Sequence, residues 1–417
     1  MLVTERNEGD RPADDVIEAY VRDHGIDGLE DLLADLFHWR MPGAPVQPQL
    51  PAEILGFLDE DPAPPAWFTG AGDPWQRIAN ARQLYQRSRR TAMVVLGCAS
   101  LPYCYAHGEI AGALIMSGRL ASQVRRRLGE TANFVHTVMG EDALQKGGAG
   151  LLWIRKVRLI HAAMRALLLE DYARHQHRDD ESVANVLLKR RWVYRDRQPI
   201  NQVEMAYVLL TFSLVVVDGW KALGITVSDE EQSDYLFAWA FIGHLMGIQE
   251  PLLSRCTTRA RAEALFAEII ASQRARQQQA ERLVDEIARG QRLPDETEAA
   301  EAVEIVGAIE SGRLLTAALL VLLRKSVLDN QPDAAPWFNK TLAQSVIRWL
   351  VDTQTAEQLW VDPAPVVRSV LHQLLIGVGG IARLGRGESG LCTDFGRSIE
   401  QSFCGQAPRF SAAARGD

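Results

Sequence analysis

The chain has 417 residues, of which 47% are hydrophobic, so it can bury a large core and differs from disordered or disulfide-stapled proteins. Its 45 basic and 53 acidic residues give a formal net charge of -8, which argues against a general nucleic-acid-binding or membrane-surface protein. The five cysteines are widely spread, without a CxxC or CxxCH motif, which indicates reduced thiols. We therefore expect a small-molecule or apolar partner and no nucleic acid.

The first residues, Met-Leu-Val-Thr-Glu-Arg, lack the basic region, apolar run and cleavage site of a secretory signal. We expect a cytoplasmic protein if Met1 is the native start, and a secreted one if a signal peptide has been removed. The apolar runs at 206–217 and 314–323 are shorter than the ~20 residues of a spanning helix, so no transmembrane segment is predicted. A monomer is favoured.

Apolar residues recur every three or four positions along most of the chain, and no segment alternates with a period of two. This pattern predicts an all-α protein with a single large helical domain at 51–383, an N-terminal helical extension at 1–50 and a C-terminal tail at 384–417. An irregular connector is expected at 60–73, and two surface helices at 258–290. The other helices are predicted at 14–39, 74–96, 105–116, 120–139, 151–174, 202–223, 229–247, 296–328, 337–351 and 366–381.

The helix predicted at 151–174 carries cationic side chains on one face. Arg158, His161 and Arg165 fall within roughly 60° of one another around the helix axis. Apolar residues cover the other directions, which is typical of a buried helix. Burying an arginine is costly unless an anion pairs with it, so the sequence predicts a negatively charged partner inside the protein. Ala162 and Ala163 leave room beside the imidazole for a flat group.

Several motifs that would indicate other chemistry are missing from the sequence. It contains no P-loop, no GxGxxG motif, no Glu-x-x-His pair, no HExxH motif and no nucleophile elbow. In a helical protein with an inward histidine and buried arginines, haem is the simplest cofactor, because imidazole binds iron and guanidiniums pair with propionates. A single inward histidine is more often a core residue than a ligand, and the two arginines make the alternatives about equal for His161.

A second set of polar residues precedes this helix. Arg127 and Thr131 are four residues apart and share a helix face, although the neighbouring Arg125 and Arg126 favour a solvated basic face for Arg127, and Thr131 has filler as its alternative role. Glu109 opens an apolar helix, where capping is the simpler role and a general base is the alternative. Structural roles are expected for His244, Asn201 and Gln202.

The segment Arg158-Leu-Ile-His161-Ala-Ala-Met-Arg165 resembles the Arg-x-x-His-x-x-x-Arg helix of the latex-clearing protein (rubber oxygenase) and MpaB-like oxygenase family. The order and spacing of other segments within about 50–253 support the resemblance. These segments are Arg127-x-x-x-Thr131, Pro199-Ile-Asn201-Gln202, Thr211-Phe212-Ser213 and Tyr235-Leu-Phe-Ala-Trp239-Ala-Phe-Ile-Gly243-His244-Leu-Met-Gly247.

The resemblance implies core helices in a globin-like arrangement around a buried, non-covalent b-type haem. It also implies oxidative cleavage of carbon–carbon double bonds in an isoprenoid, either rubber-like polyisoprene or a smaller terpenoid, with O2 as co-substrate and carbonyl products. By position, the family pattern makes His161 the proximal iron ligand and gives Arg158 and Arg165 the role of orienting it and the haem. It places Arg127 and Thr131 on the distal side and makes Glu109 the candidate base for an allylic proton.

One residue departs from the family pattern. The rubber-cleaving members carry a lysine immediately before the threonine, whereas this chain has Glu130. Because an acid cannot reproduce a neutral-amine contact, distal control and the substrate are expected to differ, and Glu130 is an alternative base. Two other functions stay open: a non-catalytic haem-binding sensor or carrier, and a helical interaction protein without a cofactor.

Overall fold

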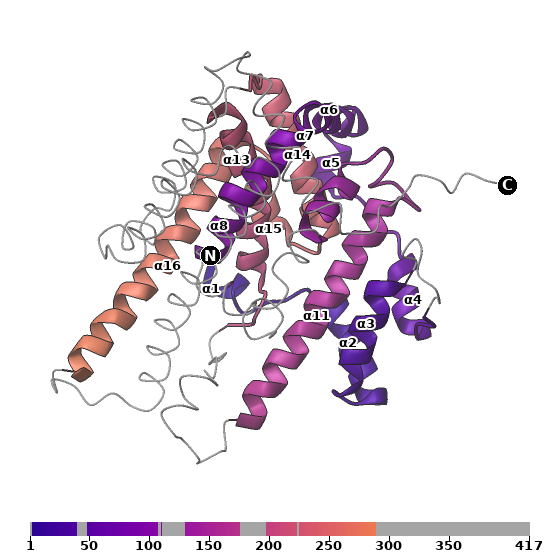
Figure 1. The fold of residues 1–417 in the computed structure, drawn as a ribbon, viewed down its shortest axis with the longest axis vertical. Helices are drawn as coiled ribbons and strands as arrows, with labels where there is room; N and C mark the ends of the chain where they lie inside the picture. Colours follow the sequence, from indigo (N-terminus) through magenta and orange to yellow (C-terminus); the bar gives the residue numbers. More distant parts are fainter. Residues whose placement is uncertain are drawn as a thin grey trace, which may run out of the picture.

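The computed structural model describes residues 2–39, 48–106, 110, 130–175, 197–222 and 225–288 (Figure 1). Every regular element in this part of the chain is a helix, so the all-α class is confirmed, and its globin-like arrangement stays a prediction. Several predictions lie outside the described residues: the apolar run at 314–323, the helices at 296–328, 337–351 and 366–381, most of those at 105–116 and 120–139, the tail at 384–417, Glu109 and Arg127.

The longest helix near the centre is α11 (Ala149–His175), which confirms the helix predicted at 151–174. Its 27 residues span about 40 Å at the rise of an α-helix. Leu151 and Ile154, near its start, belong to one hydrophobic cluster, whereas Leu159 and Ala163 belong to a second. The helix therefore connects two separate cores.

The first core lies around α13 (Gln202–Ala222), which packs against α14 (Asp229–Leu245). Both helices begin with a side-chain cap. Asn201 Oδ1 accepts bonds from the backbone N–H groups of residues 203 and 204, at 3.0 and 3.1 Å. Ser228 and Glu231 form a reciprocal capping box at the start of α14.

A 20-residue stretch of α13, Gln202–Lys221, is long and apolar enough to cross a membrane by length and composition. The apolar run recognised in the sequence, 206–217, is shorter than this stretch, because the helix continues through the polar residues Gln202, Glu204 and Lys221 at its margins. Since 89% of the apolar window is buried against the rest of the protein, α13 resembles the core helix of a globular fold.

Four consecutive helices follow from residue 74 onward; the first packs against α14 and the other three against α13. They are α6 (Pro74–Arg87), α7 (Arg89–Val95), the π-helix η1 (Leu96–Ser100) and α8 (Leu101–Ala106). The prediction of a single helix at 74–96 is therefore wrong, because the helix is interrupted at Ser88. That residue adopts φ -108° and ψ 14°, a non-helical conformation that separates α6 from α7.

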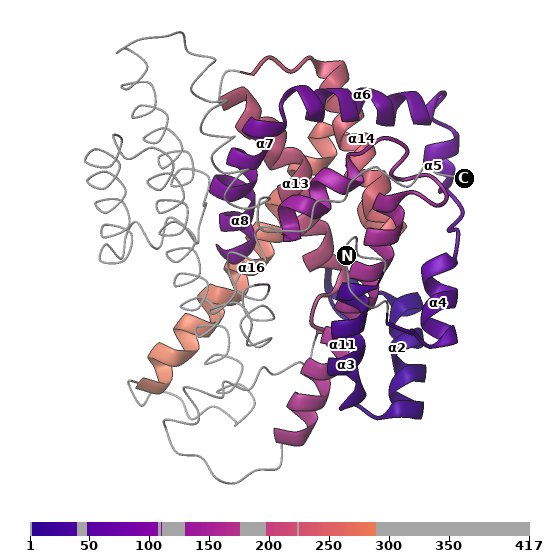
Figure 2. The ribbon, with the colours of Figure 1, turned by 45° about the vertical axis from the view of Figure 1, so that its right-hand side comes forward.

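The second core lies between α11 and the N-terminal helices α2 (Arg11–His24), α3 (Gly28–His38) and α4 (Ala52–Asp59). These three helices lie together beside the lower part of α11, and the turned view shows the same arrangement (Figures 1 and 2). The single helix predicted at 14–39 is wrong, because Gly25 takes a φ of 77° and ends α2. The predicted N-terminal extension is packed on α11.

The described part of the chain also contains the helical segment 130–138, α1 (Leu2–Glu5), α5 (Ala66–Thr69), α15 (Glu250–Leu253) and α16 (Arg259–Ala288). The connector predicted at 60–73 thus contains one helical turn. The two surface helices predicted at 258–290 form a single helix, because no glycine or proline interrupts its 30 residues. Its residues Ala262, Leu265 and Ile269 are buried in the first core.

Candidate functional site

The cationic face of α11 is largely buried. Arg158 is 9% exposed and Arg165 is 2% exposed. His161 lies between them on the same face, is half-buried, and its Nδ1 atom is buried. The helix therefore holds an imidazole between two guanidiniums in the interior of the protein.

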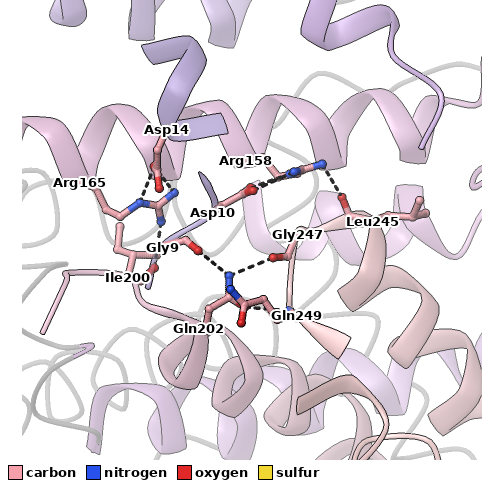
Figure 3. A network of polar contacts seen from close by, with 10 residues as sticks. All are labelled: Gly9, Asp10, Asp14, Arg158, Arg165, Ile200, Gln202, Leu245, Gly247 and Gln249. Atoms are coloured by element: carbon pink, nitrogen blue, oxygen red, sulfur yellow. Dashed lines mark hydrogen bonds and ion pairs between the residues drawn. The ribbon is translucent and has the colours of Figure 1, made fainter. Parts of the chain in front are cut away.

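Arg158 has a bidentate ion pair with Asp10, from the segment that precedes α2 (Figure 3). Nε donates to Oδ2 at 2.6 Å and Nη2 donates to Oδ1 at 2.8 Å. The guanidinium also contacts the Leu245 carbonyl at 3.4 Å and lies 5.0 Å from the centre of the Phe57 ring. Because Asp10 is 1% exposed, both charges of this pair are removed from water.

Arg165 has a similar pair with Asp14, in the first turn of α2. Its Nε and Nη2 atoms lie 2.8 and 2.7 Å from Asp14 Oδ1, and Nη1 donates to the Ile200 carbonyl at 2.9 Å. Burial raises the pKa of Asp14, and the opposing effect of Arg165 does not cancel this shift. Ile200 has a φ of 54°, rare for a β-branched residue, so its backbone is strained where its carbonyl meets Arg165.

The anionic partners predicted for the two arginines are thus carboxylates of the chain itself. Both guanidiniums are already engaged, so in this arrangement they do not fit the role of main partners for haem propionates. The half-buried imidazole of His161, with the small residues Ala162 and Ala163 after it, would be the residue that holds the iron of a haem. The haem-binding roles of these residues stay predictions.

Two more cations on α11 contact backbone carbonyls at the ends of α3 and α4. Arg155 donates to the Leu58 carbonyl at 2.7 Å, and burial lowers its pKa. Lys156 donates to the Trp39 carbonyl and lies 5.6 Å from the ring centres of both Trp39 and Trp153. These contacts were missed from the sequence, and they fix α11 further against the N-terminal layer.

Of the predicted distal residues, the structure describes only Glu130 and Thr131. Both are half-buried and lie at the start of the helical segment 130–138. Glu109 and Arg127 lie outside the described residues. Within the described ranges, no group of three or more His, Cys, Asp and Glu side chains is placed to hold a metal ion. Arg158, His161 and Arg165 are thus the predicted site residues that the structure brings together.

The sequence matches a family described as ER-bound oxygenase mpaB/B'/Rubber oxygenase, catalytic domain, over residues 84–379. The chain belongs to this family. The match covers more than half of the chain and confirms the resemblance suggested by the Arg158–Arg165 segment.

The chain is also similar to a rubber oxygenase sequence and to a latex clearing protein structure. The rubber oxygenase of Streptomyces sp. (strain K30) is 20% identical over 256 residues, covering 61% of this chain and 57% of the relative. The chain thus matches little more than half of that protein's length. The structure of latex clearing protein LCP in the closed state is 15% identical, covers 95% of this chain and 91% of that chain, and has a TM-score of 0.53. This similarity shows a shared fold.

The mpaB/rubber oxygenase match includes α11 but begins after α2, so Asp10 and Asp14 lie outside it. These carboxylates are the functional candidates that the sequence interpretation missed. Asp10 directly precedes α2 and Asp14 lies in its first turn, so their spacing of four residues was the available signal. The roles predicted for two other residues hold: Asn201 caps α13, and His244 Nε2 lies 3.0 Å from the Ala63 carbonyl, as expected for a structural histidine.

Thr211 and Ser213, which contributed to the resemblance, are buried within α13. Thr211 Oγ1 lies 3.2 Å from the Cys104 Sγ and donates to the Val208 carbonyl at 2.8 Å. Ser213 donates to the Leu209 carbonyl at 2.9 Å. Burial raises the pKa of Cys104 to about 12, so this thiol is protonated at neutral pH.

Proposed function

We propose that this protein is a haem-dependent oxygenase that cleaves carbon–carbon double bonds of an isoprenoid to carbonyl products. The observation that carries the proposal is the position of His161, held on a buried helix between two ion-paired arginines in a chain that belongs to an oxygenase family. The name of the Streptomyces relative, rubber oxygenase, supports the substrate class.

In this proposal, a nitrogen of His161 binds the iron, and α11 fixes the direction of the imidazole. A bound b-type haem supplies the iron centre at which O2 is activated. Ala162 and Ala163, which follow His161, are buried in the second core, where apolar side chains exclude water. Arg158 and Arg165 act by orienting α11, because their charges are balanced by Asp10 and Asp14.

Proton removal is assigned to a carboxylate on the opposite side of the cofactor. Glu109 is the proposed base for an allylic proton, with Glu130 as the alternative, and Arg127 and Thr131 are proposed to lie on the same distal side. A carboxylate serves as this base when burial raises its pKa toward neutrality. Replacing Glu109 and Glu130 one at a time by glutamine distinguishes them, since the base variant loses turnover while keeping bound haem.

The substrate and the location of the protein are proposed together. A smaller terpenoid fits a cytoplasmic protein, and polyisoprene fits a secreted one, because the polymer cannot enter a cell. Oxygen consumption measured with each compound, combined with fractionation of cells that produce the protein, separates these alternatives. Oxygen uptake only with the terpenoid, by protein in the cytoplasmic fraction, supports the first.

The visible spectrum and iron content of purified protein test the cofactor assignment. Wild type and His244→Ala are expected to show a haem Soret band, because His244 contacts the Ala63 carbonyl on another part of the fold. His161→Ala is expected to lose or shift this band. An unchanged band in His161→Ala would refute the ligand assignment.

Two results point instead to the other functions predicted from the sequence. A tight six-coordinate iron without oxygen uptake on either isoprenoid identifies a haem sensor or carrier. A wild-type protein that shows no Soret band after haem addition identifies a helical interaction protein.

A further inference from the structure

Residues 6–14, here called the strap, cross from α13 to α11. The backbone N–H of Gln198 donates to the Arg6 carbonyl at 3.0 Å, and that of Gln202 donates to the Glu8 carbonyl at 2.9 Å. The strap is therefore fixed to the start of α13 by its own backbone before it reaches the two arginines.

The side chain of Gln202 ties the strap to the turn that follows α14 (Figure 3). Its Nε2 donates to the carbonyls of Gly9 and Gly247 at 2.6 and 3.1 Å, and its Oε1 accepts the Gln249 N–H at 2.9 Å. The Gln249 side chain returns to the strap, where Nε2 donates to Glu8 Oε2 at 2.5 Å. One buried amide thus joins the strap, α13 and the turn after α14.

The turn after α14 is shaped to admit the strap. Gly247 has a φ of 82°, and a Cβ atom there would lie 2.7 Å from the carboxylate of Asp10. A side chain at this position would displace Asp10, the partner of Arg158. The approach of the strap therefore depends on glycine at this position.

We propose that the strap sets the position of His161, and that Asp10 and Asp14 are positioning residues for it. The role of His161 itself rests on the proposed function. Arg158 lies three residues before His161 and Arg165 four residues after it, and the strap holds both. Rotating or sliding α11 relative to the strap would break two buried ion pairs. The strap lies outside the family match at 84–379, so these residues are additional to the matched catalytic domain.

Substitutions in the strap and in the turn after α14 test this inference without changing any residue of the predicted haem site. Asp14→Asn removes one charge with little change of shape, and Asp10→Asn removes the more buried one. Gly247→Ala keeps both carboxylates but displaces Asp10. Asp15→Asn is the matched control, because the Asp15 side chain is 64% exposed and lies 4.0 Å from Arg11.

Two measurements are made on each folded variant. Hydrogen exchange of residues 149–175 is followed in the purified protein without added haem, with α13 as the internal reference. Haem is then titrated while the Soret maximum and the affinity are recorded. In Asp14→Asn and Gly247→Ala, hydrogen exchange relative to wild type is expected to accelerate more in α11 than in α13. Both variants are expected to shift the Soret maximum and to bind haem about tenfold more weakly, which is the lower end of the effect of replacing residues that orient a metal ligand.

The outcomes test the role of the strap and the proposed function separately. If Asp10→Asn does not fold, Asp14→Asn and Gly247→Ala decide the result. Exchange in α11 and a haem spectrum that match those of Asp15→Asn would overturn the inference. If wild type binds no haem, the proposed function fails, and hydrogen exchange still decides whether the strap fixes α11.

Discussion

The two buried ion pairs of α11 differ in their surroundings. The Arg158 and Asp10 side chains are 10% and 1% exposed, whereas those of Arg165 and Asp14 are 2% and 20% exposed. Burying such pairs costs much of the Coulomb energy that they gain, so their main effect is to fix geometry. The raised pKa of Asp14 agrees with this view, because burial there outweighs the neighbouring guanidinium.

Removing one partner of the deeper pair is expected to be costly. Asp10→Ala leaves Arg158 buried without its carboxylate, so the free energy of unfolding should fall by about 3–5 kcal/mol. Urea denaturation measures this change. Asp15→Ala, at the exposed pair with Arg11, should change stability by at most about 1 kcal/mol. Equal losses in the two variants would contradict the importance of the buried pair.

The two described free thiols, Cys104 and Cys256, should resist alkylation. Burial raises the pKa of each to about 12, so the reactive thiolate is scarce at neutral pH and the sulfur is shielded. Iodoacetamide labelling followed by peptide mass spectrometry should modify both residues in denaturant and neither in the native protein. Rapid native labelling of Cys104 would show that the contact between α8 and α13 opens.

At the scale of helices, local signals predicted much of the structure. The bounds of α11, α13 and α14 follow from apolar periodicity and from the caps at Asn201 and Ser228. The errors have equally local causes. Gly25 ends α2 within a continuous apolar pattern, and the absence of glycine and proline joins the two helices expected at 258–290.

The site could be predicted only in part. Periodicity placed Arg158, His161 and Arg165 on one face, because those residues lie on a single helix. Their anionic partners are separated from them by 148 and 151 residues, and no local pattern reports a contact of that range. The need for buried anions was therefore deduced correctly, whereas their origin in Asp10 and Asp14 required the fold.

The pair between α6 and α14 gives a pH-dependent contribution to stability. A hydrogen bond from Arg87 lowers the pKa of Glu231 below its ordinary value of 4.5, so the folded protein binds this proton less tightly than the unfolded chain. The contribution is therefore present at neutral pH and is lost as the pH falls through the lowered pKa.

The Glu231→Gln variant tests this contribution, since glutamine keeps the capping-box geometry without the charge. Its stability should be below that of wild type at pH 7, and the difference should shrink toward pH 3 in a series of urea titrations. Glu230→Gln, on the exposed side of the same turn, serves as the control. A difference that grows on acidification would contradict the assignment.

At the scale of the whole molecule, α11 joins two hydrophobic cores. Leu151 and Ile154, near its start, contribute to the core around α13 and α14, whereas Leu159, Ala162 and Ala163 contribute to the core under α2, α3 and α4, the helices beside α11 in Figure 2. Because one helix belongs to both cores, they should lose structure together. His161 lies in the part of α11 that contributes to the second core.

Leu159→Ala tests this coupling, since Leu159 is fully buried in the second core. The cavity should lower the free energy of unfolding by about 2–5 kcal/mol. Hydrogen exchange should then accelerate in both α3 and α13. Leu167→Ala, at a half-buried position of the same helix, should have a smaller effect. Faster exchange confined to α3 would show that the cores open independently.

The strap also dictates an order of events during synthesis. Its partners extend from Arg158 to Gln249, so the segment made first must wait until about 240 further residues have been added. At translation rates of about 5–20 residues per second, this delay is roughly 10–50 s. Arg158 and Arg165 follow their carboxylates by 148 and 151 residues, so the centre of α11 acquires its complete set of contacts late, when the two ends of this long loop meet.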